Sequence, residues 1–552
     1  MWLNSKKIVF ILIVLLGFFL RIYQVDSIPP GLTWDEAALG YNAYSILKTG
    51  RDEYGTILPL NLKSFGDYKP ALYAYVLIPF IAVFGLSEIA VRIPSVLFGV
   101  GTIIVLYFLI QKLFQNKKLS LAVSFMVAVS PLSIQFSRGA FESNAAVFLN
   151  SLGTLLFLIG LKKPKILFYS AVVLGLSLFT YQASKIFVPI LVTGLLLIYR
   201  DDLRYTKTFF TAAFIFSLFF ALSLWITFGL GQADRLSAQN FFAYTRAEEV
   251  ISQIASEDRV SEKDFYFNFL HGEYFAYIRG FIERYFIYFS PKMLFIEGDY
   301  SPRHSVPDLG VLLYISLILI PLGILFLLNN ENKKSRNLVL FLLFTAALPA
   351  VLSRDLISTN RSLNILIPCT ILEGLGLYLF IFYILKLKKI YRYFVLMVFA
   401  GIFVFNYSIF VDRYFVHMPY EFSQDWLYGY KQVFTSLNQT KLDEYNKVVI
   451  TDEYGQPYIY YLFYTKYPPQ KFQQQSVLEK KSSDVGTVRK IDNIEFRRID
   501  WPLERGDKNS LFIGTDGELP NPDIKPFPEY KILNETNFLD NSPALKIVEI
   551  SK

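Results

Sequence analysis

The chain has few of the side chains that hold metal ions and cofactors. Its 552 residues include a single cysteine, Cys369, and three histidines. One cysteine cannot form an intrachain disulfide, and so few thiols and imidazoles support a metal site only weakly, although a divalent metal ion remains an open alternative. The sequence also lacks a P-loop and a dinucleotide-binding glycine fingerprint. Nucleotide-driven chemistry is therefore disfavoured, and any activated substrate should arrive already bound to the membrane.

Charge is also scarce, and apolar residues take its place. Charged residues make up 18% of the chain, whereas hydrophobic residues make up 53% and aromatic residues 17%. This composition is typical of a polytopic membrane protein. The net charge of +8 does not indicate nucleic acid, because the basic residues stand in short clusters between apolar segments, where the positive-inside bias puts them. Membrane lipids are therefore expected partners, and nucleic acid is not.

The apolar segments predict about eleven membrane-spanning helices, since about 20 helical residues cross the roughly 30 Å of hydrocarbon in a bilayer. Lys6 and Lys7 place the N-terminus in the cytoplasm. No small-residue cleavage site follows the first segment, so we expect it to be retained as a helix. The expected spans are 8–25, 91–113, 119–137, 143–161, 166–182, 185–199, 208–230, 309–328, 337–352, 362–385 and 393–411.

Two long loops, 26–90 and 231–308, face the outer side in this topology. The first contains an apolar run that ends at Phe84, is only about 15 residues long and carries Pro79. A crossing there would also place Lys112, Lys117 and Lys118 on the outer side, against the positive-inside bias. We therefore expect a re-entrant or interfacial helix at this run. The second loop is rich in aromatic residues, which favour the headgroup region of the bilayer.

The last part of the chain differs from the membrane body, 1–411. Residues 412–552 contain no apolar span, and strand-like runs alternate there with turn-rich segments. The predicted fold is a polytopic α-helical protein of the plasma membrane, with a small α/β domain on the outer, extracytoplasmic side.

Two adjacent carboxylates, Asp35 and Glu36, follow the first span on the outer side. Acidic side chains beside the hydrocarbon are costly to desolvate, so they indicate a function. Asp35 is the candidate general base, which would accept a proton from an attacking hydroxyl group. Glu36 is a second candidate catalytic residue, and it could instead orient its neighbour or cap the following helix. The alternative is that both only supply negative charge at a helix N-terminus.

Two cations, Lys69 and Arg361, stand at membrane boundaries on the same side. A lysine there suits a lipid phosphate, and an arginine can fork onto phosphate oxygens. We therefore predict that both bind a donor phosphate. The alternative for Lys69 is ordinary snorkelling of its side chain at the membrane boundary, and the alternative for Arg361 is contact with lipid headgroups.

Other polar residues of the outer turns are candidates for binding the acceptor or supporting the site. They are Asp67, Arg138, Glu142, Arg303 and His304. An Arg138–Glu142 ion pair that stabilises a turn is the alternative for those two residues. His304 could bind a metal or a phosphate, but no close spacing of His, Cys and acidic residues supports a metal there.

Three motifs resemble the N-terminal part of the GT-C glycosyltransferases, among them the dolichyl-phosphate-mannose protein mannosyltransferases and the bacterial lipid A aminoarabinose transferases. They are GLTWDEA at 31–37, GDYKPALY at 66–73 and FGLSEIAVRIPS at 84–95. The resemblance covers roughly residues 10–160. It implies that Asp35 serves as the base, that Lys69 contacts the donor phosphate and that Asp67 corresponds to an acid that helps hold a metal in some members. Arg361 matches a family arginine only by position.

Together with this resemblance, the sequence predicts an inverting glycosyltransferase. It would transfer a sugar from a polyprenyl-phosphate-linked donor to a hydroxyl group of a protein, lipid or cell-envelope glycan at the outer face. The alternative is a non-enzymatic flippase or transporter of polyprenyl-linked sugars, which should carry charges along a path through the bilayer and on both faces. The candidate residues cluster on one side instead, which favours the enzyme.

Overall fold

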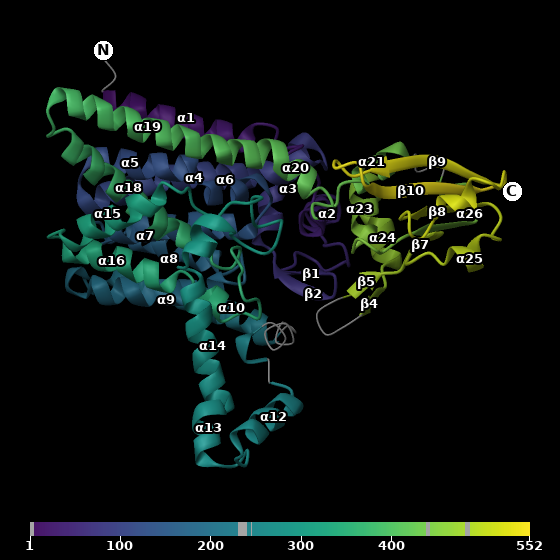
Figure 1. Cartoon of the computed structure of the whole chain (residues 1–552), viewed down its shortest axis with the longest axis horizontal. Coiled ribbons are helices and arrows are strands. Elements are labelled where there is room, and N and C mark those ends of the chain that lie inside the picture. Colours follow the sequence, from purple (N-terminus) through teal and green to yellow (C-terminus); the bar gives the residue numbers. More distant parts are fainter. Residues whose placement is uncertain (1–4, 230–239, 244–245, 438–441, 481–485, 552) are drawn as a thin grey trace.

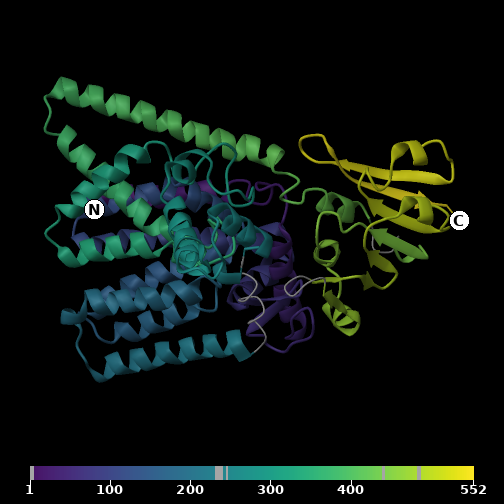
Figure 2. The same ribbon diagram turned by 60° about the horizontal axis from the view of Figure 1, so that its bottom comes forward.

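Long helices form an elongated bundle, and a β-sheet lies beyond one end of it (Figures 1 and 2). The computed structural model describes residues 5–229, 240–243, 246–437, 442–480 and 486–551. The bundle helices are α1 (Ser5–Ile22), α4 (Glu88–Phe114), α5 (Lys117–Val129), α6 (Pro131–Arg138), α7 (Glu142–Gly160), α8 (Ile166–Ser177), α9 (Ser184–Ile198), α10 (Lys207–Gly229), α15 (Ser316–Leu328), α16 (Lys333–Thr345), α17 (Leu348–Val351), α18 (Leu366–Ile384) and α19 (Lys389–Asp412).

Small residues allow close packing inside the bundle. A Cβ atom on Gly323 of α15 would lie 2.0 Å from the Leu372 carbonyl oxygen, and one on Gly376 of α18 would lie 1.9 Å from that of Leu319. Glycine is therefore required at both positions, because the two helices touch through their backbones. Such contacts are typical of helix packing in membranes, where small residues replace the hydrophobic driving force.

The membrane class of the fold is confirmed, but the number of clear spans is smaller than predicted. Among the described residues, six helices are long and apolar enough to cross a bilayer, or seven if the bent pair α5–α6 is one span. The other four predicted spans are helices too. The 18-residue α1 carries Lys6, Lys7 and Arg21, and α8, α9 and α15 have only 12, 15 and 13 residues. Position 230, the predicted end of one span, lies outside the described residues.

The first long loop folds between the bundle and the sheet (Figure 1). It contains α2 (Trp34–Thr49), the antiparallel hairpin β1 (Asn61–Ser64) and β2 (Asp67–Pro70), and α3 (Leu72–Phe84). Phe65 and Gly66 connect the strands with positive φ angles of 54° and 86°, which is the geometry of a type I′ turn. The short apolar helix expected near Pro79 is α3, with 13 residues. The hairpin itself was missed.

The second long loop forms an arm that projects sideways from the bundle (Figure 1). Its helices are α12 (Glu248–Asp258), α13 (Phe265–His271) and α14 (Glu273–Ile287), followed by a π-helical turn, η3 (Lys292–Ile296). Aromatic side chains on the arm are exposed, with Phe265 at 84% and Tyr274 at 87%. Their location in the headgroup region stays a prediction, and residues 230–239 and 244–245 of this loop lie outside the described residues. The same loop contains the short 3₁₀ turn η2 (Phe241–Ala243), and further 3₁₀ turns elsewhere are η1 (Arg200–Asp202) and η4 (Leu363–Ile365).

The C-terminal region is built on a six-stranded mixed sheet, which confirms the predicted α/β character. The strand order is β6-β7-β3-β8-β10-β9, and β3 runs parallel to β7 and β8 while the other pairs are antiparallel. The strands are β3 (Lys447–Ile450), β6 (Lys490–Ile491), β7 (Ile494–Phe496), β8 (Ser510–Gly514), β9 (Tyr530–Asn537) and β10 (Pro543–Ile550), with a separate pair, β4 (Leu478–Lys480) and β5 (Gly486–Val488). The accompanying helices are η5 (Arg413–His417), α20 (Met418–Glu421), α21 (Tyr430–Ser436), α23 (Pro457–Tyr464), α24 (Pro469–Gln475), α25 (Trp501–Glu504) and α26 (Asn521–Ile524).

The C-terminal region and the first loop share one hydrophobic core. Buried residues of α2, α3, α23 and the sheet belong to a single cluster. The Tyr460 hydroxyl donates to the Leu32 carbonyl at 2.9 Å, and the Tyr41 hydroxyl donates to the Tyr467 carbonyl at 3.0 Å. The predicted division into 1–411 and 412–552 stays a prediction, but the two parts are packed together through α2.

Candidate active site

Asp35 and Glu36 lie in the first turn of α2, at the end of the bundle nearest the sheet (Figure 1). The Glu36 backbone N–H donates to the Thr33 hydroxyl at 3.2 Å, and the Thr33 N–H donates to the Glu36 carboxylate at 2.9 Å. This reciprocal pair is the capping box that a Thr-x-x-Glu sequence forms at a helix start. It directs the Glu36 side chain inward, whereas the Asp35 side chain stays 49% exposed.

Glu36 is fully engaged in structural contacts. The Arg92 Nε and the Ala140 backbone N–H both donate to Glu36 Oε1 at 3.0 Å. The side chains of Arg92 and Glu36 are 0% and 4% exposed. Glu36 therefore links α2 to α4 and to the turn before α7. Its catalytic role stays a prediction, and the contacts favour the alternative in which it orients and caps.

Arg92 was missed in the sequence, although it organises the approach to α2. Its Nη1 donates to the carbonyls of Val25 and Pro29, at 2.9 Å each, and its Nη2 donates to the Gly31 carbonyl. A buried guanidinium needs such partners because an unpaired charge is costly in the interior. The available signal was a lone arginine inside the apolar motif at 84–95.

The candidate base and the candidate phosphate ligand are in contact: Asp35 forms an ion pair with Lys69 of β2. The Lys69 side chain is only 14% exposed, and its Nζ lies 5.3 Å from the centre of the Phe65 ring. The hairpin and the helix start therefore bring together two groups that are 34 positions apart in the chain. One is a half-exposed carboxylate, and the other is a cation held in place by its strand.

Asp67 lies two residues before Lys69 on the same strand, so both side chains point to one face of the hairpin. Its Oδ1 accepts a hydrogen bond from the Tyr68 backbone N–H at 2.7 Å. Among the described residues, no three His, Cys, Asp or Glu side chains form a group that could hold a metal ion. Asp67 thus shares a face of the hairpin with Lys69, and its role stays a prediction.

Glu53, a second residue that was missed, is a buried acid near the same hairpin. Its side chain is inaccessible to solvent, and the Asn42 amide donates to its Oε1 at 3.1 Å. Burial raises the pKa of Glu53 to about 8, although the Asn42 hydrogen bond and the positive charge of Lys69 act against this rise. The Asp-Glu pair at 52–53 gave no signal, because adjacent acids usually belong to a solvated loop.

Arg303 reaches the start of α2. Its guanidinium carbon lies 4.0 Å from the centre of the Trp34 ring, and its Nε donates to the Asp425 carbonyl at 2.7 Å. Trp34 is the residue next to Asp35, so the structure brings Arg303 to the edge of the candidate site. Stacking on an aromatic face is a common arrangement for arginine and leaves its other donors available.

His304 lies in a neighbouring network centred on a third missed residue, Asp299. His304 Nδ1 is 3.6 Å from Asp299 Oδ2, and the Thr359 backbone N–H donates to that oxygen at 2.6 Å. Burial opposes ionisation of Asp299, but His304 and the N–H groups of Ser301 and Thr359 outweigh it and hold the pKa of Asp299 below its usual range. This carboxylate joins the loop before α15 to the turn before α18.

Arg361 belongs to a cluster around that turn. It forms an ion pair with Asp355 and donates to the Ser353 hydroxyl at 3.1 Å. Arg284 of α14 donates to the carbonyls of residues 353–355 at 3.0 to 3.1 Å. The turn is therefore tied to the arm, and contact of Arg361 with a donor phosphate stays a prediction.

Arg138 is a buried structural cation. It donates to the carbonyls of Leu20 at 3.0 Å and Ile28 at 2.8 Å, and its guanidinium carbon lies 4.8 Å from the centre of the Phe415 ring. Within the described part of the chain, no carboxylate is among its hydrogen-bonding partners. Arg138 thus fixes the segment between α1 and α2, while Glu142 lies in the first turn of α7.

The architecture is that of a known class of membrane glycosyltransferases. ArnT from Cupriavidus metallidurans, solved with undecaprenyl phosphate bound, superposes with a TM-score of 0.52 at 10% identity, and the alignment covers 99% of this chain and 98% of that chain. At this identity the likeness shows the fold alone. The oligosaccharyltransferase AglB from Archaeoglobus fulgidus, in complex with an inhibitory peptide and a dolichol-phosphate, gives a TM-score of 0.49 at 12% identity and covers 84% of this chain and 64% of that chain.

Sequence comparisons match part of the chain to mannosyltransferases. Residues 68–225 match the family model of the dolichyl-phosphate-mannose-protein mannosyltransferases. A protein of Bacillus subtilis (strain 168) named "Putative mannosyltransferase YkcB" is 27% identical over 171 residues, which are 30% of this chain and 23% of that relative. The match therefore spans less than a quarter of the curated relative. The predicted resemblance to GT-C glycosyltransferases, a class that uses polyprenyl-phosphate donors, is confirmed.

Proposed function

We propose that this chain transfers a sugar from a polyprenyl-phosphate-linked donor to a hydroxyl acceptor at the outer face of the membrane, with inversion at the anomeric carbon. The observation that carries the proposal is the Asp35–Lys69 pair, which joins a half-exposed carboxylate to a cation at the end of the bundle. Support also comes from the match of residues 68–225 to the mannosyltransferase family and from ArnT, whose structure holds undecaprenyl phosphate.

In the proposed reaction, the acceptor hydroxyl attacks the anomeric carbon from the side opposite the phosphate. Asp35 takes the hydroxyl proton, a new C–O bond forms, and the bond between the sugar and the phosphate oxygen breaks. The leaving group is the polyprenyl phosphate, on which negative charge develops. Lys69 has three N–H donors, so it can contact this phosphate and Asp35 together and stabilise the developing charge from a fixed position.

Topology is part of the proposal, since the site must face the outer side. The site and the C-terminal sheet lie at the same end of the bundle, and the basic segments at 111–118 and 162–165 lie at the other end. The positive-inside bias would place that basic end in the cytoplasm. Cysteine labelling tests this orientation, because the single native cysteine is buried. Lys508→Cys should react with an impermeant reagent outside intact cells and Lys118→Cys should not; the reverse pattern overturns the topology.

The activity test uses the purified chain in proteoliposomes with undecaprenyl-phosphate-mannose as the first donor, scored by release of undecaprenyl phosphate in the presence of hydroxyl acceptors. Asp35→Asn should lower the rate by about 10²–10⁴-fold, the usual contribution of a general base. The control is Asp26→Asn, which removes an exposed acid from the segment between α1 and α2 and should leave the rate unchanged. The anomeric configuration of the product, read by NMR, tests inversion.

Two results would count against the proposal. An Asp35→Asn chain with the normal rate would remove Asp35 as the base. Movement of the lipid-linked sugar across the bilayer without its consumption would favour the transporter alternative.

A further inference from the structure

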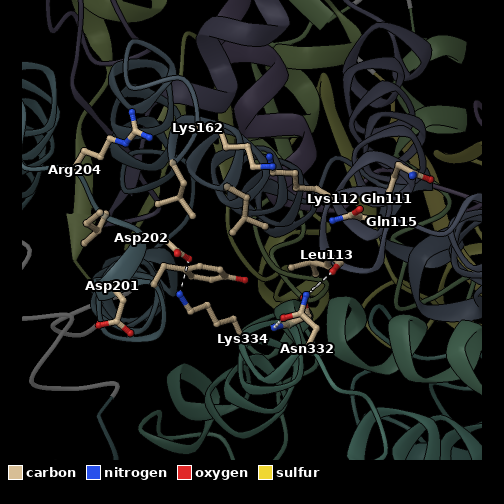
Figure 3. A pocket seen from close by; sticks show the side chains of 15 residues that line it. Gln111, Lys112, Leu113, Gln115, Lys162, Asp201, Asp202, Arg204, Asn332 and Lys334 are labelled. Atoms are coloured by element: carbon tan, nitrogen blue, oxygen red, sulfur yellow. Dashed lines mark hydrogen bonds and ion pairs between the residues drawn. The ribbon is translucent and has the colours of Figure 1, made fainter.

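A second polar site lies at the far end of the bundle, away from the C-terminal sheet. A cavity of about 660 Å³ opens there between the ends of α4 and α9 and the turns before α8 and α16. Figure 3 shows its charged lining, which we call the basic pocket: Lys112, Lys162, Arg204, Lys334, Asp201 and Asp202. Its volume is within the range of pockets that hold small molecules.

The basic pocket is remote from the candidate active site. Glu88 begins α4 and forms an ion pair of 2.9 Å with Lys431 of the C-terminal region, whereas Lys112 lies near the other end of the same helix. The 24 residues between them correspond to roughly 35 Å at the helical rise of about 1.5 Å per residue. A ligand in the basic pocket therefore cannot be the group that reacts beside Asp35.

The acidic residues of the pocket already have partners. Asp202 forms an ion pair with Lys334 at 2.7 Å, and Asp201 lies 3.5 Å from Arg200. Figure 3 shows the Asp202–Lys334 pair, with Lys112 and Lys162 on another wall and Arg204 to the side. The carboxylates are thus neutralised locally and do not balance the remaining cations.

Three cations that line the basic pocket are not paired with its carboxylates. Within the described residues, the side chains of Lys112, Lys162 and Arg204 have no hydrogen-bond or ion-pair partner. The positive charges of Lys162 and Lys163 also act on Lys112 from close by. Like charges repel, so their convergence around a cavity costs free energy unless an anion is bound. The positive-inside bias does not require this convergence, since Lys117, Lys118 and Lys165 serve it from exposed positions that do not line the cavity.

We propose that the basic pocket binds a phosphate group through Lys112, Lys162 and Arg204. Lysine and arginine are the usual partners of phosphate oxygens, the first as point charges and the second as a fork. The amides of Gln111 and Gln115 line the same cavity and can donate to polar groups attached to the phosphate. The phosphate can come from the headgroup of an anionic lipid or from a soluble compound. This proposal does not depend on the transfer reaction.

The test measures binding to the full chain in nanodiscs of phosphatidylcholine at constant ionic strength. One arm adds phosphatidylglycerol to the nanodisc, and the other adds inorganic pyrophosphate to the buffer, with the shift of the unfolding midpoint and native mass spectrometry as readouts. The variant Lys112→Gln/Lys162→Gln/Arg204→Gln removes the three cations. The control Lys117→Gln/Lys118→Gln/Lys165→Gln removes the same charge outside the cavity.

We expect the native chain and the control to bind in at least one arm, and the pocket variant to bind at least about tenfold more weakly, because each charge-assisted hydrogen bond contributes about this factor. Binding in the lipid arm alone identifies a headgroup, and binding in the pyrophosphate arm alone identifies a soluble ligand. Equal weakening in both variants, or no binding to the native chain in either arm, overturns the proposal.

Conservative variants separate loss of binding from misfolding. Lys112→Arg/Lys162→Arg keeps the charge and should keep the binding. The single change Lys162→Gln alters an exposed side chain, so it should fold normally and still weaken binding. If Lys162→Gln folds normally and binds as the native chain does, Lys162 is not a ligand and the proposed site is wrong.

Discussion

The two ends of the bundle arrange their charges in opposite ways. Near the C-terminal sheet, Arg92 and Glu36 are buried and hold each other at 3.0 Å. In the basic pocket, Lys112, Lys162 and Arg204 face a cavity and have no carboxylate partner among the described residues. Burial explains the difference. A charge inside a protein must be paired, whereas water stabilises a half-exposed charge, which can therefore remain unpaired until a ligand binds. The first arrangement fixes chain segments, and the second leaves capacity for binding.

The largest effect is expected at the buried pair. Arg92→Gln leaves the Glu36 carboxylate buried without its cation and should lower the free energy of unfolding by about 3–5 kcal/mol. Lys334→Gln breaks the half-exposed pair with Asp202 and should cost at most about 1 kcal/mol. Thermal unfolding in one detergent, followed by size-exclusion fluorescence, measures both. Similar losses in the free energy of unfolding for the two variants would show that the ion pairs at the two ends stabilise the fold equally.

A smaller free-energy change, with a large effect on rate, is expected at Lys69. Lys69→Met removes the cation beside Asp35 and should reduce sugar transfer by about 10²–10³-fold, as loss of a preorganised donor does elsewhere. Lys69→Arg should restore part of the rate. Lys63→Met, on the paired strand of the same hairpin, is the matched control and should transfer normally. An unchanged rate in Lys69→Met would show that this pair only supports the fold.

The pH dependence of stability should report on Glu53. Its pKa is about 8 in the folded chain against an ordinary value of 4.5, so the folded chain holds this proton more tightly than the unfolded chain. The resulting stabilisation is complete below pH 4.5 and is lost as the pH rises to about 8. Glu53→Gln mimics the protonated acid and should match the native unfolding midpoint at pH 4.5 and exceed it at pH 8. A constant difference across this range would contradict the assignment.

The smallest effect on the free energy of unfolding is expected at Lys162, an exposed cation of the basic pocket. Without anionic lipid, inorganic phosphate or pyrophosphate present, Lys162→Gln should change the free energy of unfolding by no more than about 0.5 kcal/mol, because an exposed cation with no partner among the described residues stabilises nothing. Relief of repulsion could make the change slightly stabilising. Chemical unfolding in phosphatidylcholine nanodiscs checks this, and a loss of several kcal/mol would mean that the pocket is structural.

Features that depend on local pattern could be predicted from the sequence. The membrane helices followed from apolar length, and the start of α2 at Trp34 is encoded by the adjacent Thr33 and Glu36. The meeting of Asp35 and Lys69 on one face followed from the order of the loops. The roles of Arg92, Glu53 and Asp299 did not, because each depends on burial by segments distant in the chain, which no periodicity encodes.

The turn that carries Arg361 shows a second limit. Its position on the outer side stays a prediction, and its attachment to Arg284 of the arm had no signal in the sequence. The same holds for the sheet: strand-like runs mark β3, β8 and β10, whereas their order depends on parallel crossovers. Composition and spacing therefore define which elements exist, and long-range hydrogen bonds decide which of them meet.

The core shared by α2 and the C-terminal region makes the candidate site a late product of synthesis. The Tyr460 hydroxyl bonds to a carbonyl that precedes it by 428 residues. At the usual rate of about 5–20 residues per second, the ribosome needs roughly 20–90 s to make that stretch. During this interval the acid-bearing helix has no cover from its later partners. Because the membrane helices α4 to α19 lie between these two segments in the chain, the candidate site is completed only after all of them have been synthesised.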